Sequence, residues 1–244
     1  MGVLNVTPDS FSDGGRWLDP DAAVEHGLRM VAEGADVIDV GGESTRPGAE
    51  PVSSDEELRR VLPVVEALSG HVRVSIDTRH AEVAEAAIQA GATLVNDVSA
   101  SLAHVAAAAG AGWVAMHMQG DPRTMQQAPA YDDVVAEVRA FLVERADAAE
   151  VTEVWIDPGI GFGKTMAHNL SLLRHLDQLV ATGYPVLVGT SRKGFLGKLT
   201  DNAPADDRLE ASVATAAWAI AQGAGMVRAH DVAPTVEAAR LLDR

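Results

Sequence analysis

Eight short runs of apolar, often β-branched residues alternate along this 244-residue chain with longer segments whose apolar residues recur at helical spacing. The runs are apolar on both faces, which is typical of parallel strands covered by helices. The alternation allows an open doubly wound sheet or a closed barrel, and eight units within this length favour closure. We therefore predict an α/β fold, a (β/α)8 TIM barrel in which residues 1–244 form a single domain. The predicted strands are 3–7, 36–40, 73–77, 93–97, 113–117, 154–157, 185–189 and 226–230.

Capping signals and a weak internal repeat mark the helix boundaries. Asp19 and Pro20 fit the N-cap and first turn of one helix, and Ser54 with Glu57 fits a capping box at the start of the next. Several predicted helices end in a Gly-Ala pair followed by a strand that ends in a polar residue, which supports a repeated βα unit. These pairs are 34–35, 91–92, 110–111 and 223–224.

The charge and composition of the chain narrow its partners. Its 35 acidic and 19 basic residues give a formal net charge of −16, which disfavours nucleic acid and anionic membrane surfaces. The absence of cysteine excludes disulfides, thiolate zinc sites and cysteine nucleophiles. No run reaches the roughly 18 apolar residues of a membrane span, and the first residues lack the pattern of a signal peptide. We expect a cytoplasmic protein without nucleic-acid or membrane partners.

Polar residues stand at or just beyond the end of every predicted strand. In a barrel of this kind the carboxyl ends of the strands meet at one mouth, and side chains placed there carry the chemistry. Each of these residues could instead cap the helix that follows it, but a full set on a chain this apolar predicts a functional site. The residues are Asn5, Asp39, Asp77, Asn96, Asp97, His117, Asp157, Ser191, Arg192, Lys193, Arg228 and His230.

The loop after the sixth predicted strand, residues 157–165, is rich in glycine and ends in Gly-Lys-Thr. It is not a Walker A loop, because three residues rather than four separate Gly159 from Gly163. It also lacks the final x-x-G of a dinucleotide-binding loop. We interpret it as a segment whose glycines let a flat ligand approach the backbone.

Cations gather at the last two predicted strands. Arg192 and Lys193 follow strand seven and Arg228 lies in strand eight, where such barrels commonly bind phosphate. The alternative is a set of solvated surface cations. No histidine pair has metal-ligand spacing, and no Gly-x-Ser-x-Gly elbow is present. The histidines predicted to lie on surface or helical stretches without a functional role are His71, His80, His104 and His168.

Several of these strings together resemble the dihydropteroate synthase family, and the resemblance covers nearly the whole chain. The most specific are MGVLNVTPDSFSDGG at 1–15, DPGIGFGK at 157–164 and SRKGF at 191–195. Members of this family join 6-hydroxymethyl-7,8-dihydropterin diphosphate to p-aminobenzoate with Mg²⁺ present, releasing pyrophosphate and forming 7,8-dihydropteroate for folate biosynthesis. The accompanying strings are GGESTRPG at 41–48, SIDT at 75–78, VNDV at 95–98, MHMQG at 116–120 and RAHD at 228–231.

The resemblance implies roles for individual residues, a homodimer and a target of sulfonamide drugs. The residues that would hold the pterin are Asp77, Asn96, Met116, Asp157, Phe162 and Lys193. The residues that would hold the diphosphate are Asn5, Thr45, Arg46, Arg228 and His230, with Asn5 also contacting Mg²⁺. Those near p-aminobenzoate would be Phe11, Pro47, Ser191 and Arg192. The catalytic set would be Asn5, Asp9, Phe11, Ser12, Thr45, Arg46 and Lys193.

The sequence leaves two other functions open. A methyltetrahydrofolate-dependent methyltransferase that acts on a corrinoid protein shares the barrel and the pterin-facing residues. Such an enzyme needs neither the 7–12 segment nor the 191–193 string. A non-catalytic paralogue that only binds pterin has no use for the residues expected around a second substrate, such as Asp9 and Arg46. Both considerations favour the synthase.

Overall fold

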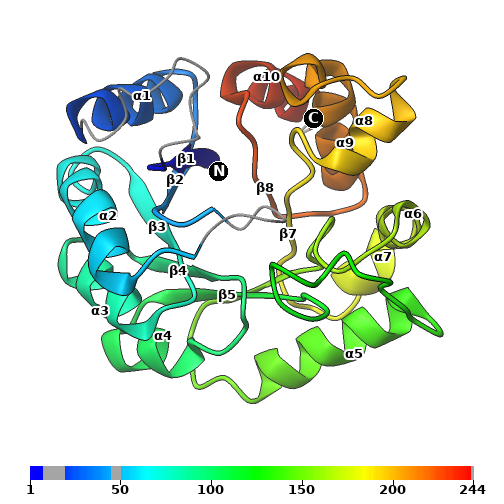
Figure 1. The fold of residues 1–244 in the computed structure, drawn as a ribbon, viewed down its shortest axis with the longest axis horizontal. Helices are drawn as coiled ribbons and strands as arrows, with labels where there is room; N and C mark the ends of the chain where they lie inside the picture. The colour runs from blue at the N-terminus through cyan, green and yellow to red at the C-terminus, as the bar shows by residue number, and fades with distance from the viewer. Residues whose placement is uncertain (8–19, 45–50, 243–244) are drawn as a thin grey trace.

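The computed structural model describes residues 1–7, 20–44 and 51–242, which form a ring of parallel strands surrounded by helices (Figure 1). Strands β1 to β6 form one parallel sheet in chain order, and β7 pairs with β8. The predicted barrel is confirmed. The strands are β1 (Gly2–Asn5), β2 (Val37–Gly41), β3 (Arg73–Asp77), β4 (Leu94–Asp97), β5 (Gly112–Met116), β6 (Val154–Asp157), β7 (Leu187–Val188) and β8 (Met226–Val227).

Two short parallel contacts close the ring between the six-stranded sheet and the β7–β8 pair. Ile156 in β6 forms a bridge to Val186, and Gly2 in β1 forms a bridge to Ala229. The amide of Val3 also donates to the carbonyl of Ala229 at 3.0 Å. The last two strands span two residues each and are shorter than predicted, because regular ladder pairing gives way to isolated contacts beside them.

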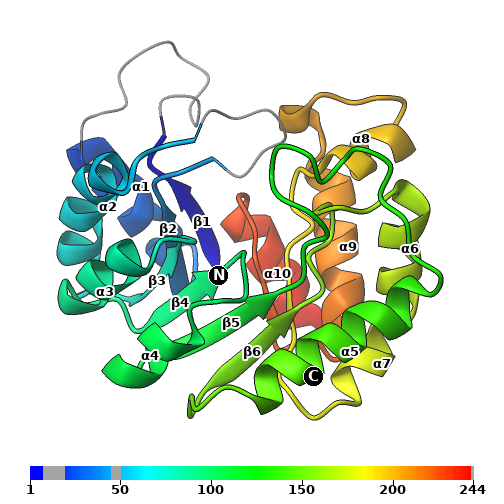
Figure 2. The same cartoon turned by 60° about the horizontal axis from the view of Figure 1, so that its bottom comes forward.

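Helices cover the outside of the ring, and Figure 2 shows β1 to β6 as one twisted sheet with helices along its outer face. Helix α1 begins at Pro20, as predicted. The helices are α1 (Pro20–Ala32), α2 (Ser54–Leu68), α3 (Ala81–Gln89), α4 (Ala103–Ala109), α5 (Val134–Asp147), α6 (Met166–Arg174), α7 (Leu176–Val180), α8 (Gly194–Leu199), α9 (Leu209–Ala221) and α10 (Val232–Leu242), with a 3-10 turn at Ala205–Asp207.

The start of α2 differs from the prediction in one respect. The helix begins at Ser54, but Ser53 is the N-cap, and its hydroxyl oxygen accepts from the amide of Glu56 at 3.3 Å. The predicted capping box of Ser54 and Glu57 is therefore wrong by one residue. Glu57 is fully buried, and its carboxylate lies 2.7 Å from the imidazole of His80.

Two apolar clusters lie on either side of the strands. The larger one fills the space between strands and helices. The smaller one, Leu94, Val114 and Leu187, lies inside the ring. Leu94 and Val114 come two residues before Asn96 and Met116, which face the barrel mouth, so they share its side of the sheet. The mouth therefore stands on an apolar floor, which is completed by the partly buried Met1, Trp155 and Met226.

Within the described ranges, none of the helices combines the length and the apolar character needed to cross a membrane.

Candidate active site

A cavity of about 880 Å³ opens at the carboxyl ends of the strands. Every predicted substrate-binding or catalytic residue that the structure describes contributes to its lining. Those residues are Asn5, Asp77, Asn96, Met116, Asp157, Phe162, Ser191, Arg192, Lys193, Arg228 and His230. Asp9, Phe11, Ser12, Thr45, Arg46 and Pro47, which were also predicted to belong to the site, lie outside the described residues.

The strand register sets one row of residues around part of the mouth. Asn5 pairs with Gly41, Gly41 pairs with Asp77, and Asp77 pairs with Asn96. Gly41 leaves its place in the row without a side chain. A β-carbon there would lie 3.4 Å from the β-carbon of Asp77 and 3.6 Å from the amide oxygen of Asn5. The absence of that carbon leaves room between a carboxylate and an amide that both face the cavity.

Arg228 sits between two buried carboxylates. Its Nε donates to Asp39 at 2.6 Å and one terminal nitrogen donates to Asp77 at 2.8 Å. The side chain of Arg228 is 20% exposed, that of Asp77 is 11% exposed and that of Asp39 is fully buried. Burial raises the pKa of Asp77, and the neighbouring guanidinium of Arg228 opposes that rise. The guanidinium therefore pairs with a carboxylate on each side, and Arg228 also contributes to the cavity wall.

Lys193 and Asp157 form the second charged part of the cavity. The ammonium of Lys193 lies 4.8 Å from the ring centre of Phe162 and donates to the carbonyl of Ile160. Burial lowers the pKa of Lys193 to about 8, and the nearby Asp157 carboxylate opposes the change. Burial raises the pKa of Asp157, opposed by Lys193 and by the amide of Gly159, which donates to it at 2.7 Å. One cation, one carboxylate and one aromatic face thus meet at a single wall.

The glycine-rich loop after β6 adopts a left-handed backbone at three positions. Gly159, Gly161 and Gly163 have φ of +63°, +87° and +61°. A β-carbon at Gly159 would lie 1.9 Å from the carbonyl oxygen of His117, and one at Gly163 would lie 2.4 Å from that of Gln119. The predicted reason for the glycines, close approach by a ligand, therefore fits only Gly161, which lines the cavity. Gly159 and Gly163 instead allow the loop after β5 to pack closely against the backbone of the glycine-rich loop.

A buried lysine that was not predicted to have a role ties these two loops together. Lys164 is 2% exposed, and its ammonium donates to the carbonyls of Phe162 at 2.9 Å and His117 at 3.2 Å. It also lies 3.0 Å from Nδ1 of His117. Burial lowers the pKa of Lys164 to about 7, and burial together with Lys164 lowers that of His117 to about 3. His117 therefore serves as a neutral acceptor. The only feature of the sequence that indicates a role for Lys164 is its position directly after the glycines of this loop.

The loop after β7 and the end of β8 meet at another side of the cavity. The hydroxyl of Ser191 accepts from the amide of His230 at 3.1 Å and lies 3.0 Å from its Nδ1. Arg192 forms a paired contact with Asp231 at 2.5 and 2.9 Å, and its side chain is 38% exposed. Serine, histidine and arginine are therefore brought together as predicted, with Arg192 turned partly toward Asp231.

Three strand-end residues, Asp39, Asp97 and His117, are absent from the cavity lining. Asp97 accepts from the amides of Ser101 and Leu102, both at 2.6 Å, and so organises the start of α4. The alternative interpretation of strand-end polar residues, that they cap the next helix, is correct for Asp97.

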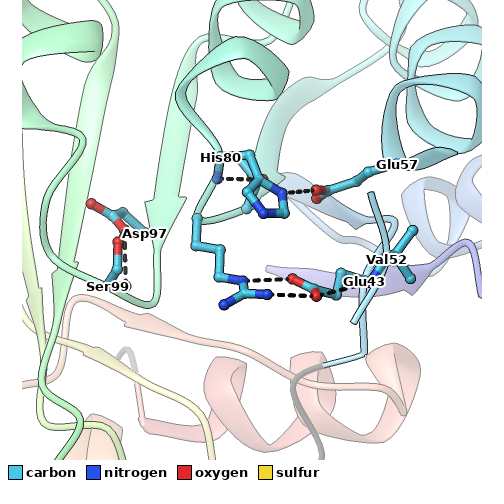
Figure 3. A network of polar contacts seen from close by, with 8 residues as sticks. Glu43, Val52, Glu57, His80, Asp97 and Ser99 are labelled. Atoms are coloured by element: carbon cyan, nitrogen blue, oxygen red, sulfur yellow. Dashed lines mark hydrogen bonds and ion pairs between the residues drawn. The ribbon is translucent and has the colours of Figure 1, made fainter. Parts of the chain in front are cut away.

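A polar network beside the cavity joins the loops after β2 and β3 (Figure 3). The carboxylate of Glu43 accepts two hydrogen bonds from Arg79, both at 2.9 Å, and one from the amide of Val52 at 3.2 Å. The Glu57 and His80 pair lies next to it, and the ligand atoms of Glu43, Glu57 and His80 lie within 4.8 Å of one another. His80 therefore has a charged partner, which its spacing in the sequence does not indicate. Arg79 already neutralises Glu43, so the network fits a structural tie between two loops.

The fold and the site define a barrel enzyme whose cavity, at the carboxyl ends of the strands, is lined by charged, polar and apolar side chains. Comparison with known proteins makes the class specific, because the model of the family described as pterin binding enzyme matches residues 1–230. The dihydropteroate synthase of Mycobacterium leprae is 51% identical over 99% of this chain and 91% of the relative.

Solved structures agree with this similarity. The Yersinia pestis dihydropteroate synthase, solved with a sulfonamide drug complex, has a TM-score of 0.94 and 47% identity over 100% of this chain and 92% of its own. The Xanthomonas albilineans dihydropteroate synthase in complex with 7,8-dihydropteroate has a TM-score of 0.88 and 46% identity over 99% and 90%. The chain belongs to the dihydropteroate synthase family.

Proposed function

We propose that this enzyme condenses 6-hydroxymethyl-7,8-dihydropterin diphosphate with p-aminobenzoate, giving 7,8-dihydropteroate and pyrophosphate. One observation carries the proposal: a single cavity gathers Asp77, Asn96, Asp157 and Lys193, whose hydrogen-bonding groups complement a pterin. The close similarity to a synthase solved with 7,8-dihydropteroate supports the same product here.

The pterin slot follows from the donors and acceptors of the ligand. The aminopyrimidinone edge presents N–H groups, which the carboxylates of Asp77 and Asp157 and the amide oxygen of Asn96 can accept. Lys193 can donate to a ring acceptor, and Met116 with Phe162 can cover the flat faces. A buried site that pairs every polar edge discriminates against ligands that lack those groups.

The diphosphate would lie between Asn5, Arg228 and His230, which all line the cavity. Mg²⁺ fits beside Asn5, because the amide oxygen is a hard ligand and Mg²⁺ usually takes its remaining ligands from water and substrate phosphate. When bound, Mg²⁺ supplies charge stabilisation on the phosphate oxygens. The Glu43, Glu57 and His80 group does not include Asn5 and is not part of this proposal.

The chemistry needs a good leaving group and a stabilised carbon. The bond between the pterin methylene carbon and the diphosphate oxygen breaks, and the departing oxygen takes the electron pair. Arg228 and His230 stabilise the charge that grows on that oxygen, while the nearby carboxylates favour positive charge on the pterin methylene. The p-aminobenzoate nitrogen then forms the new bond to that carbon and loses a proton, which the released pyrophosphate or water takes up. Ser191 and Arg192, which line the same cavity, would contact this second substrate.

The remaining assignments complete the proposal. Asp9, Phe11, Ser12, Thr45, Arg46 and Pro47 keep the roles that the family resemblance implies. We infer that the enzyme works in the cytoplasm as a homodimer and that residues 1–244 form a single barrel domain. The lining residues of the cavity all come from one barrel, which supports the single domain.

A coupled assay of pyrophosphate release tests the function. Release should require the pterin diphosphate, p-aminobenzoate and Mg²⁺ together, and 7,8-dihydropteroate should appear in equal amount. Binding of the pterin without any turnover would favour the non-catalytic alternative. Methyl transfer from methyltetrahydrofolate to a corrinoid protein would favour the methyltransferase.

Asp157→Asn should weaken pterin binding while the fold is kept. One oxygen can still accept from Gly159, but the other becomes an N–H group that faces an N–H group of the ligand. A mismatched buried pair costs about 1–3 kcal/mol, so the affinity should fall about fivefold to over a hundredfold. Calorimetric titration of the folded variant measures this, and an unchanged pterin affinity would reject the assignment.

Pterin affinity should also fall as the pH rises through about 8, where buried Lys193 loses its proton. The pKa of Lys193 is lowered by burial, so its ammonium, and with it the charge-assisted hydrogen bond to the pterin, is present below that pH and is lost above it. A ligand that needs one bound proton loses about tenfold in affinity per pH unit above the pKa. Calorimetry from about pH 7 to about pH 9.5 measures the slope. In Lys193→Arg, the guanidinium stays protonated, and the alkaline decrease should disappear. A wild-type affinity that stays flat over this range would contradict the role of Lys193.

A further inference from the structure

Asp39 lies in β2 one layer below the residues that line the cavity. It is fully buried, and the strand register places it two residues before Gly41, on the same side of the sheet as the mouth. It does not contribute to the cavity lining. Any effect of Asp39 on a ligand must therefore pass through another residue.

One oxygen of Asp39 holds two residues of the proposed site. Oδ2 accepts from the side-chain amide nitrogen of Asn96 at 2.9 Å and from Nε of Arg228 at 2.6 Å. Arg228 in turn donates to Asp77 at 2.8 Å. A single buried carboxylate in β2 thereby connects side chains from β3, β4 and the end of β8.

The contact decides which end of the Asn96 amide faces the cavity. The nitrogen of the amide donates to Asp39, so the oxygen is the end left for a ligand. A flipped amide would place its oxygen against a carboxylate oxygen, which is repulsive and leaves a buried acceptor unpaired. Asp39 therefore fixes Asn96 as an acceptor, which suits the N–H edge of a pterin.

The placement of Asp39 is costly for stability. Its second oxygen, Oδ1, is buried and has no hydrogen-bond partner among the described residues. An unsatisfied buried oxygen costs free energy, and an apolar residue that fills the same space is often as stable as a buried charge or more so. The carboxylate is therefore better explained by the side chains it orients than by the stability it contributes.

We propose that Asp39 is a positioning residue that fixes the acceptor end of Asn96 toward the pterin and holds Arg228 for the diphosphate. The inference rests on the proposed function, because it assumes that these two groups bind parts of one substrate. Asp39 thereby sets the hydrogen-bonding pattern of a ligand that it does not touch.

The test is a double-mutant cycle of Asp39→Asn and Asn96→Asp, read by titration with 6-hydroxymethyl-7,8-dihydropterin without phosphates. Asp39→Asn lets the amide at 96 turn either way, and Asn96→Asp alone sets two buried carboxylates against each other. Each single variant should bind the pterin about tenfold to a hundredfold more weakly. The double variant exchanges donor and acceptor, leaves a carboxylate oxygen facing the pterin, and should bind at least about tenfold better than Asn96→Asp alone.

The diphosphate substrate gives a second readout. The double variant should not recover its affinity for this substrate. In the wild type one oxygen of Asp39 accepts from both Asn96 and Arg228, whereas in the variant the amide nitrogen takes its place and cannot accept from Arg228. Asp97→Asn is the matched control, since Asp97 is an equally buried carboxylate on the opposite side of its strand, where it accepts from Ser101 and Leu102. This variant should lower stability but change pterin affinity by no more than about threefold.

The outcomes separate the proposal from a structural role and from the proposed function. If the effects of the two substitutions on pterin affinity are additive, the positioning role is rejected. It is also rejected if adding Asp39→Asn to the Asn96→Asp variant lowers the pterin affinity further. The second comparison does not need Asp39→Asn alone, so it can be made even if that single variant does not fold. If the wild type binds the pterin but the cycle shows no recovery, only the positioning role fails. If the wild type binds no pterin, the proposed function fails.

Discussion

Replacing Arg228 with alanine should lower the free energy of unfolding by about 3–5 kcal/mol, because it leaves Asp39 and Asp77 buried without their shared cation. Removing one partner of a buried ion pair is far more damaging than removing a surface charge. Burial raises the pKa of Asp77 to about 7 while Arg228 opposes the rise, so this pKa should be higher still in the variant. The loss should therefore be largest in mild alkali, where Asp77 is ionised, and should shrink toward neutral pH as Asp77 takes up a proton. Denaturant unfolding at about pH 9 and about pH 6.5 measures both effects.

Arg192→Ala is the matched control for this prediction. Arg192 also forms an ion pair, with the single partner Asp231, but the Arg192 side chain is 38% exposed and the Asp231 side chain is 22% exposed. Partly exposed pairs contribute about 0–1 kcal/mol, so this variant should be much more stable than Arg228→Ala. Equal losses in the two variants would show that Arg228 does not neutralise the buried carboxylates.

The structure also changes what Arg228→Ala should do to ligand binding. From the sequence, a role in the diphosphate site predicts that binding of the diphosphate substrate weakens far more than binding of the pterin without phosphates. In the structure, however, Arg228 donates to Asp77, a proposed pterin ligand, so both ligands should bind more weakly. The diphosphate substrate should still lose more, because it loses a direct contact as well.

Replacing Gly159 with alanine should be the most damaging single change in the glycine-rich loop. The residue has φ of +63°, and the added β-carbon would lie 1.9 Å from the carbonyl oxygen of His117. The left-handed backbone costs about 1 kcal/mol for alanine and the overlap adds about 1–3 kcal/mol, so about 2–4 kcal/mol of unfolding free energy should be lost. Pterin binding should fall too, because the Gly159 amide that orients Asp157 must move.

Gly183→Ala separates the backbone effect from the overlap. Gly183 also has a positive φ, +88°, but no atom of the described residues lies within 4 Å of the place that a β-carbon would take. This control should lose only about 1 kcal/mol and leave pterin affinity unchanged. Thermal or denaturant unfolding of both variants, with calorimetry, provides the comparison. If Gly159→Ala is as stable as Gly183→Ala, the loop after β5 can shift to remove the overlap with the His117 carbonyl at little cost in free energy.

The strands and the mouth could be predicted because their signals are local. Apolar runs and the polar residues that end them identify the barrel and place side chains such as Asp77 and Asp157 at one cavity. Contacts across the ring could not be predicted. Arg228 and Asp39 are 189 positions apart, and nothing near either residue indicates that they touch.

Some local signals were ambiguous for a physical reason. Serines at 53 and 54 both fit a helix N-cap, and only the backbone geometry selects Ser53. A strand-end aspartate can face the barrel or the outer helices, and one residue of register decides between Asn96 at the cavity and Asp97 at the start of α4. The position of Lys164 directly after the glycines marks it in the sequence, but its role follows only from the loop after β5, which lies beside it.

The ring closes where Gly2 meets Ala229, between segments separated by almost the whole chain. Bringing such distant segments together is entropically demanding, so this seam is expected to form late in folding. Asn5 and Arg228 line the cavity from the two sides of the seam. A substrate that contacts both Asn5 and Arg228 would bridge the two sides of the seam. Binding of the pterin diphosphate should therefore slow the local opening of the seam. Amide exchange at Val3, which donates across it, would report that slowing directly.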